Sequence, residues 1–356
     1  MTTVDSAPVA TSPIPGTADI RLDRLALGTA PLGNLFSAVD DPIAAATLDA
    51  ALRQGIRHWD TAPYYGLGLA EERIGNFLHS RRETMAAGTA VPLLSTKVGR
   101  LLVDRAGTQE QTDCFVDVPD RGVVYDYTSA GTLASILSSL CRLRVSCIDI
   151  ALIHDPDPET HGSDYPVVFR QVIEQALPTL YELKRSGEVR AVGVGTNSVG
   201  ACEALIREAD LDVVLLAGRF TLLEQSAANS LLPECQRRGI PVIAGAPFNS
   251  GLLAAASEPG STYEYGVVPA RQAGLARAIY EIARAYAVDV GAAALQFPLF
   301  HPAVSSVLAG ARSVGEVALL SQRIRTEIPQ AFWDELQASG ILSFRVPDPP
   351  ADGAIL

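Results

Sequence analysis

The feature that most constrains this sequence is an alternation of short apolar runs with longer amphipathic segments along most of its length. Eight apolar runs have the length and composition of buried strands. They are Leu25–Gly28, Ile56–Asp60, Leu93–Lys97, Ile148–His154, Val189–Gly195, Val213–Ala217, Pro241–Gly245 and Val304–Leu308. Segments with helical spacing follow them, as in Ile43–Gln54 and Leu133–Leu143. Eight such units in 356 residues predict an α/β fold, a closed (β/α)8 barrel of the TIM type, rather than an open sheet.

The pattern also predicts a single domain with loose ends. Residues 1–20 are expected to form a flexible N-terminal arm because they include a stretch rich in Ala, Pro, Ser and Thr. Residues 21–345 are expected to form the barrel, and residues 346–356 a flexible C-terminal tail. Three long connections follow predicted strands, at Gly99–Ser129, Asp155–Pro166 and Pro247–Pro269. We expect these loops at the C-terminal face, where barrel enzymes carry their active sites.

Composition argues against several classes of partner. The formal net charge is −12, whereas nucleic-acid phosphates are bound by clustered Lys and Arg. No apolar run approaches the ~18 residues needed to cross a bilayer. The five cysteines include no Cys-x-x-Cys pair, so neither a metal site nor a disulfide framework is expected. Together with the lack of a signal-peptide pattern, this predicts a cytoplasmic protein without nucleic-acid or membrane partners, either a monomer or a homo-oligomer.

Four titratable side chains lie at or just beyond the ends of three consecutive predicted strands. Asp60 ends the second strand, and Tyr65 follows it five residues later. Lys97 ends the third strand, and His154 ends the fourth. Consecutive strands of a barrel are neighbours, so these side chains are expected to converge at one edge.

This combination suits hydride transfer between an alcohol and a carbonyl compound, which requires a proton donor or acceptor. The pKa of a free tyrosine, near 10, is too high for efficient base catalysis at neutral pH. A nearby ammonium stabilises the phenolate and lowers that pKa, and Lys97 is placed to supply the charge. Asp60 is then expected to hold Lys97, and His154 to orient the substrate oxygen.

These motifs resemble those of the aldo-keto reductase family. That family carries an Asp-Thr-Ala-x-x-Tyr-Gly block, a Ser/Thr-Lys strand end and a Leu-x-His strand end, and all three stand here in the same order. The resemblance extends over about residues 25–336 and implies that the four strand-end residues are catalytic. The family's spacing from aspartate to tyrosine favours Tyr65 over the adjacent Tyr64.

The resemblance also implies a nicotinamide cofactor that lies across the barrel rim without a Rossmann fingerprint. Thr196 and Asn197 match the block that binds the carboxamide, and Phe220 matches the aromatic residue that stacks on the nicotinamide ring. The expected cofactor-binding residues are Gly28, Thr29, Thr196, Asn197, Phe220, Pro247, Ser250, Gly251, Leu253, Gly310, Arg312, Ser313 and Glu316. NADPH-preferring relatives often carry cations where Gly310 and Glu316 stand. Because Glu316 would repel a 2′-phosphate, NAD is the expected cofactor and NADP the alternative.

Within the family, the sequence is similar to the L-fucose and D-threo-aldose 1-dehydrogenase group, with pyridoxal 4-dehydrogenase nearby. Segments 27–35, 95–102 and 217–223 carry this resemblance. It implies a small-molecule substrate, a cyclic aldose oxidised at C1 to the lactone, with Tyr65 accepting the hydroxyl proton and NAD+ the hydride. The residues expected to contact the sugar are Phe36, Trp59, Asp126, Asp155, His161 and Asn249.

The residues leave other activities open. An NADPH-dependent aldehyde or ketone reductase would use the same four side chains in the reverse direction. A Schiff-base lyase would use Lys97 as its nucleophile, although the Asp60 and Tyr65 pair and the cofactor segments argue against it. A non-catalytic subunit would keep the fold and the cofactor and serve a partner protein, but the intact catalytic set argues against lost activity.

Overall fold

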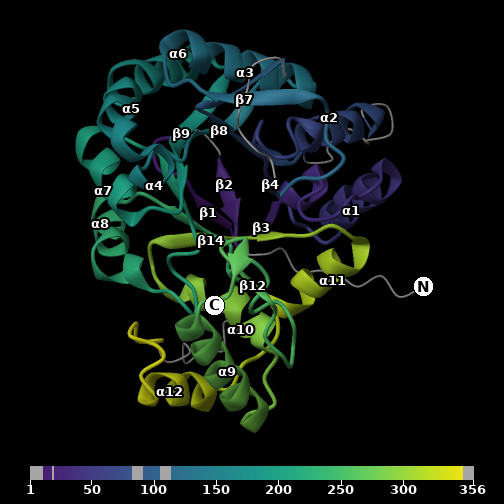
Figure 1. Cartoon of the computed structure of the whole chain (residues 1–356), viewed down its shortest axis with the longest axis vertical. Helices are drawn as coiled ribbons and strands as arrows, with labels where there is room; N and C mark the ends of the chain where they lie inside the picture. Colours follow the sequence, from purple (N-terminus) through teal and green to yellow (C-terminus); the bar gives the residue numbers. More distant parts are fainter. Residues whose placement is uncertain (1–10, 18–19, 82–90, 105–113, 348–356) are drawn as a thin grey trace.

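A computed structural model of the chain describes residues 11–17, 20–81, 91–104 and 114–347. Its centre is a closed barrel of eight parallel strands (Figure 1). In chain order the strands are β3 (Leu25–Gly28), β4 (His58–Asp60), β5 (Leu93–Val98), β8 (Ile148–His154), β9 (Val189–Thr196), β10 (Val213–Ala217), β11 (Val242–Gly245) and β14 (Val304–Gly310). Each strand pairs with the next, and β14 pairs with β3 to close the ring. The predicted (β/α)8 barrel is confirmed.

Helices surround this barrel (Figure 1). They are α1 (Asp41–Arg53), α2 (Leu69–Arg81), α3 (Ser129–Leu143), α4 (Pro158–His161), α5 (Tyr165–Gln171), α6 (Leu177–Ser186), α7 (Val199–Glu208), α8 (Leu231–Arg238), α9 (Ala270–Ala285), α10 (Val290–Gln296), α11 (Val314–Arg323) and α12 (Gln330–Ala338). Several helices begin at a residue whose side chain caps the helix. At the start of α1, Asp40 Oδ1 accepts a hydrogen bond from the Ile43 backbone at 2.8 Å. Among the described residues, no helix is long and apolar enough to span a membrane.

Strand alternation decides which side chains reach the barrel interior. In β8, Ile150 and Leu152 belong to the cluster inside the barrel, whereas Ala151 and Ile153 pack in the larger cluster with the helices. Successive side chains of a strand point to opposite faces, so His154 at the end of β8 points inward, as Leu152 does. The same alternation directs Asp60 and Lys97 into the barrel at the ends of β4 and β5.

A hairpin closes the barrel at the end where the strands begin. Strand β1 (Thr11–Pro13) pairs antiparallel with β2 (Arg21–Asp23). Ile14 and Ile20 are each 1% exposed and pack with the residues inside the barrel. The predicted flexible arm over residues 1–20 is therefore wrong for residues 11–17 and 20, because burial of these isoleucines holds them in place. Residues 1–10 lie outside the described part of the chain.

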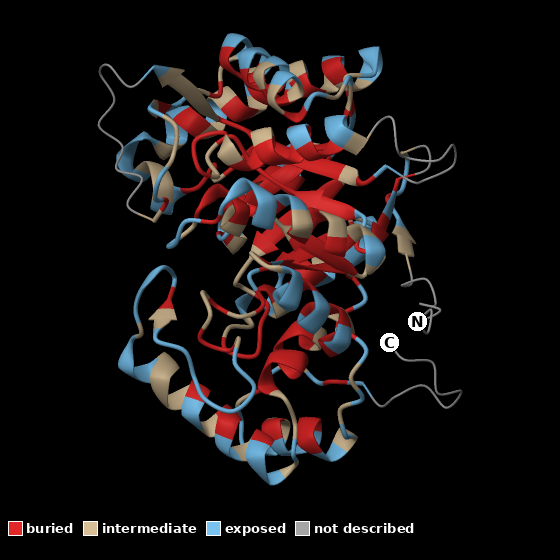
Figure 2. Cartoon of the chain, turned by 90° about the vertical axis from the view of Figure 1, so that its right-hand side faces the viewer, coloured by how far each residue is buried: buried red, intermediate tan, exposed pale blue. Residues whose placement is uncertain are grey.

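The predicted long connections lie at the opposite end of the barrel, and each contains regular structure. The first contains β6 (Arg100–Asp104) paired with β7 (Arg121–Tyr125). The second contains α4, and the third contains the short hairpin of β12 (Thr262–Tyr263) and β13 (Gly266–Val267). Figure 2 shows these hairpins on the side of the barrel opposite to both chain termini.

The predicted flexible C-terminal tail, residues 346–356, is only partly described. Val346 is 2% exposed and packs in the core, so the ordered part of the chain extends past the predicted boundary at residue 345. Residues 348–356 lie outside the described residues.

The hairpin packing predicts a stability effect without a catalytic one. Ile14→Ala should lower the free energy of unfolding by about 2–4 kcal/mol, because it removes buried methyl groups and leaves a cavity. The same change at Ile43, which is 46% exposed, should have little effect. Urea denaturation of both variants measures the difference, and equal stability would show that the hairpin does not support the barrel.

Candidate active site

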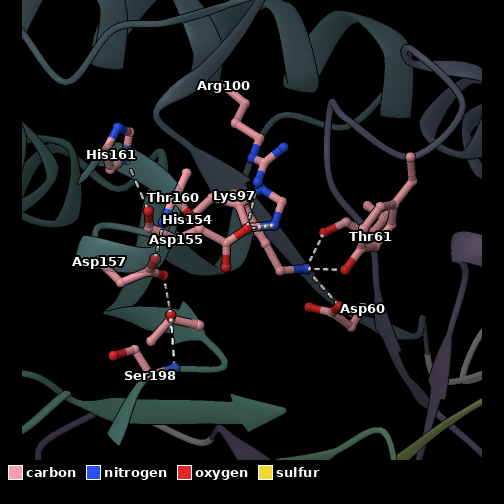
Figure 3. A network of polar contacts seen from close by, with 12 residues as sticks. Asp60, Thr61, Lys97, Arg100, His154, Asp155, Asp157, Thr160, His161 and Ser198 are labelled. Atoms are coloured by element: carbon pink, nitrogen blue, oxygen red, sulfur yellow. Dashed lines mark hydrogen bonds and ion pairs between the residues drawn. The ribbon is translucent and has the colours of Figure 1, made fainter. Parts of the chain in front are cut away.

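A buried ion pair between Lys97 and Asp60 forms the centre of the site (Figure 3). The Lys97 ammonium donates hydrogen bonds to Asp60 Oδ2 at 2.7 Å and to the Thr61 carbonyl at 2.9 Å. The two charged side chains are 2% and 1% exposed. The pairing of β4 with β5 sets Asp60 opposite Ser95, two residues before Lys97 on the same face of β5. This register brings the carboxylate and the ammonium together.

Tyr65 reaches the ion pair from the turn that follows β4. The Lys97 ammonium lies 3.1 Å from the Tyr65 hydroxyl and 4.6 Å from the centre of its ring. The turn depends on Gly66 at φ +64°, a backbone conformation that favours glycine. A Cβ on Gly66 would also clash with the carbonyl oxygen of Gly33. The close backbone contact between Gly66 and Gly33 therefore fixes the position of the Tyr65 backbone.

His154 lies beside Tyr65 at the end of β8. The two rings are perpendicular, with centroids 6.2 Å apart. His154 Nε2 is 3.4 Å from Asp155 Oδ2, and its Nδ1 is buried without a hydrogen-bond partner among the described residues. A neighbouring carboxylate favours the tautomer with the proton on Nε2. In that tautomer Nε2 is the ring's hydrogen-bond donor.

The structure thus brings Asp60, Tyr65, Lys97 and His154 together, as the sequence predicts. Tyr64, the competing tyrosine, makes different contacts: a guanidinium lies 4.3 Å from the centre of its ring. Within the part of the chain that is described, no cluster of three or more His, Cys, Asp or Glu side chains is suited to a metal ion. Asp60, Tyr65, Lys97 and His154 themselves offer proton transfer and hydrogen bonding.

Burial and charge set the protonation states of the site. Burial raises the pKa of Tyr65, and the Lys97 ammonium offsets part of that increase. Burial lowers the pKa of Lys97, but Asp60 and Tyr65 raise it more, so the net pKa lies above its usual range. Burial, and then the charges of Arg100 and Lys97, hold the pKa of His154 well below its usual value. At neutral pH the site contains an ammonium, a phenol and a neutral imidazole.

A second layer of contacts that the sequence analysis missed holds Asp60 from behind. Ser95 Oγ donates a hydrogen bond to Asp60 Oδ1 at 2.7 Å, and His58 Nε2 lies 3.0 Å from the same Ser95 oxygen. Burial lowers the pKa of His58 to about 4, so it is neutral at pH 7. Both residues stand two positions before a catalytic candidate on its own strand. That period-two spacing is the signal that could have found them.

The sequence resembles known proteins over nearly its whole length. The sequence model described as the aldo/keto reductase family matches residues 24–341. The chain belongs to the aldo-keto reductase family. A D-threo-aldose 1-dehydrogenase from a Pseudomonas species is 38% identical over 338 residues, covering 93% of this chain and 98% of the relative. Pyridoxal 4-dehydrogenase from Microbacterium luteolum is 34% identical, covering 92% of this chain and 97% of the relative.

Solved structures show the same relationship. The glycerol dehydrogenase of Gluconobacter oxydans superimposes with a TM-score of 0.68 at 25% sequence identity, covering 96% of this chain and 97% of that one. Family membership and the named dehydrogenase relatives make this chain an NAD(P)-dependent oxidoreductase that acts on a small molecule.

In this aldo-keto reductase, the predicted carboxamide-binding residues differ in what they offer a cofactor. Thr196 Oγ1 donates its proton to Asp157 at 2.6 Å and accepts a hydrogen bond from the Ser198 backbone at 3.1 Å. It therefore offers a ligand only a remaining acceptor position. Asn197 is exposed at the end of β9. Thr29 donates to the Asp60 carbonyl at 2.8 Å and is fully buried, so its hydroxyl is already occupied.

The predicted stacking role of Phe220 is wrong in this structure. Phe220 is 2% exposed. Its ring packs against Phe297 at 5.0 Å, Phe344 at 5.3 Å and His301 at 5.8 Å between centroids. It belongs to an aromatic cluster of the core, so no open face remains for a nicotinamide ring.

The loop after β11 has an unusual backbone. Asn249, Ser250 and Gly251 all have positive φ, at +46°, +58° and +94°. Asn249 is 4% exposed, and its Oδ1 has no hydrogen-bond partner among the described residues. An unpaired buried acceptor suits a donor group of a ligand. Pro247 is buried in the same loop, and Leu253 has no exposed surface and packs in the core. Cofactor binding by these two residues stays a prediction.

The N-terminus of α11 is held by a reciprocal cap. Ser313 Oγ accepts a hydrogen bond from the Glu316 backbone at 3.2 Å, and Glu316 Oε2 accepts one from the Arg312 backbone at 2.8 Å. The Arg312 guanidinium donates to Ser37 Oγ. The Glu316 carboxylate thus occupies the helix N-terminus, which is the place where a phosphate is most easily bound.

These groups fit a dinucleotide along this end of the barrel. Gly28 pairs with both Asp60 and Gly310 in the strand register, so β3 and β14 end beside the ion pair. An exposed amide at Asn197 follows β9, an unpaired carbonyl at Asn249 follows β11, and the N-terminus of α11 follows β14. The amides offer hydrogen bonds of the kinds that a carboxamide requires, and the Glu316 carboxylate at the helix N-terminus can accept one from a ribose hydroxyl.

The structure contradicts one predicted substrate contact, Trp59, and gives a second predicted residue, Asp126, a structural role. Trp59 is fully buried, donates its Nε1 proton to the Ile56 carbonyl at 3.0 Å and packs on Phe77 of α2. It points away from the site because Asp60, the next residue, points inward. Asp126 Oδ1 accepts hydrogen bonds from the Thr128 backbone and hydroxyl at 2.9 and 2.6 Å, so its carboxylate supports the start of α3.

The remaining substrate candidates lie around the catalytic centre. Phe36 is 45% exposed, and its ring centroid is 5.8 Å from that of Tyr265, between β12 and β13. The loops after β3 and β11 therefore meet. His161 Nε2 lies 3.0 Å from the Tyr127 hydroxyl and 3.1 Å from the Asp155 carbonyl, so it supports the backbone of Asp155.

The buried His58 predicts a pH-dependent loss of stability. Its pKa is lower in the folded chain than in the unfolded chain, so only the unfolded chain gains a proton as pH falls below about 6.5. This one group should lower the free energy of unfolding by about 2 kcal/mol between pH 7 and pH 5. Urea denaturation should show a smaller decrease for His58→Gln than for the wild type. The same change at the exposed His79 is the control, and an undiminished decrease in His58→Gln would contradict the assignment.

Proposed function

We propose that this aldo-keto reductase oxidises an L-fucose-like aldose at C1 to the lactone, with Tyr65 as the proton acceptor and NAD+ as the hydride acceptor. The observation that carries the proposal is the Lys97 ammonium, which donates to Asp60 at 2.7 Å and to the Tyr65 hydroxyl at 3.1 Å. The bound nicotinamide supplies a site that accepts a hydride. The side chains of the chain supply proton transfer and orientation.

Lys97 makes Tyr65 usable as an acid or base in a buried site. Burial alone would keep the phenol protonated, and the ammonium lowers the pKa of Tyr65 toward the range where proton transfer is feasible. Asp60 holds the ammonium against Tyr65 and compensates its charge. His154, neutral and beside Tyr65, is available to donate a hydrogen bond to the substrate oxygen and fix its distance from the phenol.

Protonated Lys97 also weakens the lyase alternative. A Schiff-base nucleophile must lose its proton, and such lysines usually have a lowered pKa. The net pKa of Lys97 is raised because Asp60 and Tyr65 outweigh burial. The site therefore favours acid–base chemistry at Tyr65 over attack by an amine.

The relatives support an aldose substrate. The name of the 38% identical relative is D-threo-aldose 1-dehydrogenase, and its match extends over almost both chains. A cyclic aldose presents at C1 a hydroxyl whose proton Tyr65 would accept while the same carbon gives up a hydride. Loss of the proton from the C1 hydroxyl oxygen and of the hydride from C1 forms the lactone carbonyl. The runner-up, reduction of an aldehyde or ketone with NADPH, uses the same four residues in reverse.

The cap of α11 supports NAD over NADP. A 2′-phosphate near the helix N-terminus would meet the Glu316 carboxylate, which already accepts the Arg312 backbone proton. The negative charges of the phosphate and of Glu316 would repel each other, and Glu316 already compensates the dipole of α11. A free 2′-hydroxyl would instead donate a hydrogen bond to that carboxylate.

An absorbance assay for reduced cofactor tests the activity directly. The panel should combine NAD+ or NADP+ with L-fucose, L-galactose, D-arabinose, pyridoxine-type alcohols and simple alcohols. We expect reduced NAD to form with a sugar and more slowly or not at all with NADP+. Consumption of NADPH with an aldehyde, and no oxidation of any sugar, would instead identify a reductase.

The assignment of Tyr65 predicts a specific loss of turnover. Tyr65→Phe removes the proton acceptor and should lower kcat by about 10²–10⁴-fold, while cofactor binding, followed by fluorescence quenching, stays close to that of the wild type. Tyr64→Phe is the matched control, because its ring is adjacent but does not contact Lys97, and it should keep most activity. Comparable losses in both variants would contradict the assignment of the proton acceptor to Tyr65.

A further inference from the structure

Ser95 lies directly behind the carboxylate that holds the Lys97 ammonium. It is fully buried on β5, and its hydroxyl donates a hydrogen bond to Asp60 Oδ1 at 2.7 Å. The other carboxylate oxygen, Asp60 Oδ2, accepts from Lys97 at 2.7 Å (Figure 3). We propose that Ser95, oriented by His58, is a positioning residue for proton transfer, because it holds Asp60 so that Lys97 stays against Tyr65. The proposal rests on the proposed function.

The direction of each hydrogen bond follows from the number of protons available. A serine hydroxyl has one proton and a carboxylate can only accept, so the Ser95 proton points to Asp60. His58 Nε2, 3.0 Å from the same Ser95 oxygen, must then donate to that oxygen. His58 is neutral at pH 7 because burial lowers its pKa to about 4, so its other ring nitrogen has no proton. That nitrogen, Nδ1, is buried without a partner among the described residues.

Strand alternation places these side chains in one line. His58 and Asp60 stand two residues apart on β4, and Ser95 and Lys97 stand two residues apart on β5, so each pair faces the barrel interior. The register sets Asp60 opposite Ser95. The hydrogen bonds therefore run from β4 to β5 and back, in the order His58, Ser95, Asp60 and Lys97. None of the four residues is more than 2% exposed, so water does not compete for these contacts.

Loss of the Ser95 hydroxyl would weaken the effect of Lys97 on Tyr65 in two ways. Ser95 is the only donor to Asp60 Oδ1 among the described residues, so without it the carboxylate would be free to turn. Lys97 would follow Asp60 away from the Tyr65 hydroxyl, which lies 3.1 Å from the ammonium. The uncompensated carboxylate oxygen would also add negative charge. Burial raises the pKa of Tyr65 most, Lys97 lowers it, and the charges of Asp60 and Asp155 raise it. Both changes would therefore raise the pKa of Tyr65.

The other side chains that face Tyr65 are neutral and do not depend on Ser95. Burial, before any charge, holds the pKa of His154 well below its usual value, so this imidazole is neutral at pH 7. Burial also raises the pKa of Tyr265, between β12 and β13, and the charge of Tyr65 would raise it further. A changed titration of Tyr65 in a Ser95 variant would therefore come through Asp60 and Lys97.

The pH dependence of turnover tests the proposal on the full chain, with NAD+ and the best sugar substrate at saturation. Ser95→Ala removes the donor with little change of shape. We expect it to raise the midpoint of the kcat–pH profile for oxidation by about 0.5–1 pH unit, because a hydrogen bond to a charged group is lost. Below the midpoint kcat should fall by about 3- to 10-fold, and above it kcat should approach that of the wild type. Ser95→Cys, whose thiol is a weaker donor, should give an intermediate midpoint.

Thr96→Val is the matched control. The Thr96 hydroxyl also donates to a buried carboxylate at 2.7 Å, but its acceptor is Glu71 of α2, outside the barrel. The substitution removes the same kind of hydrogen bond from the neighbouring position of β5. We expect it to lower the urea midpoint of unfolding and to leave the midpoint of the kcat–pH profile unchanged.

Two results would overturn the role of Ser95. An equal fall in kcat at every pH in Ser95→Ala would mean that Ser95 only supports the fold, and an unchanged profile would mean that Asp60 does not need it. Tyrosinate absorbance in the NAD+ complex, with Tyr65→Phe subtracted, follows the ionisation of Tyr65 without turnover. If no sugar is oxidised but this midpoint rises in Ser95→Ala, the proposed function fails and the positioning role stands. If sugar is oxidised with one midpoint in both proteins, only the positioning role fails. If neither occurs, both fail.

Discussion

The rest of the site depends on a charge that the fold must keep buried. Lys97 is 2% exposed, and an isolated ammonium at that depth would be very unfavourable. Asp60, the Thr61 carbonyl and the Tyr65 hydroxyl accept its three protons. Removing one partner of a buried ion pair typically costs about 3–5 kcal/mol, so this polar cluster is rigid by necessity. The register of β4 against β5 and the contacts around Tyr65 maintain that geometry.

The burial of the strands and of the polar residues at their ends explains why much of the fold and site could be predicted from the sequence. Buried parallel strands are covered on both faces, so they appear as short apolar runs, and their ends follow from where polar residues begin. Polar residues at the ends of neighbouring strands must then share one small space. The four catalytic candidates met this condition without knowledge of the loops, and the spacing from Asp60 distinguished Tyr65 from Tyr64.

Residues outside the strands were harder to place, because their direction depends on packing that the chain order does not reveal. Phe220 follows β10 in a turn, and only the structure shows it inside an aromatic cluster. The hairpin around Ile14 escaped prediction because its composition resembles a loose arm, although its isoleucines fill the barrel end. The direction of Trp59 could have been predicted. Trp59 precedes Asp60 on the same strand, and successive side chains of a strand point to opposite faces. Ser313 and Glu316 were predicted to contact the cofactor, but the sequence analysis did not predict that their side chains cap the N-terminus of α11.

Arg100 stands at the start of the β6–β7 hairpin, outside the barrel strands that contain Asp60 and Lys97. Asp60 and Lys97 lie at the ends of barrel strands, where almost any substitution would disturb a buried charge. The hairpin is inserted between β5 and α3, and Tyr125, which is paired with Arg100 in its register, has its ring centre 5.2 Å from the Arg100 guanidinium carbon. A change confined to this hairpin leaves the register of β4 against β5, and with it the Lys97–Asp60 ion pair, in place.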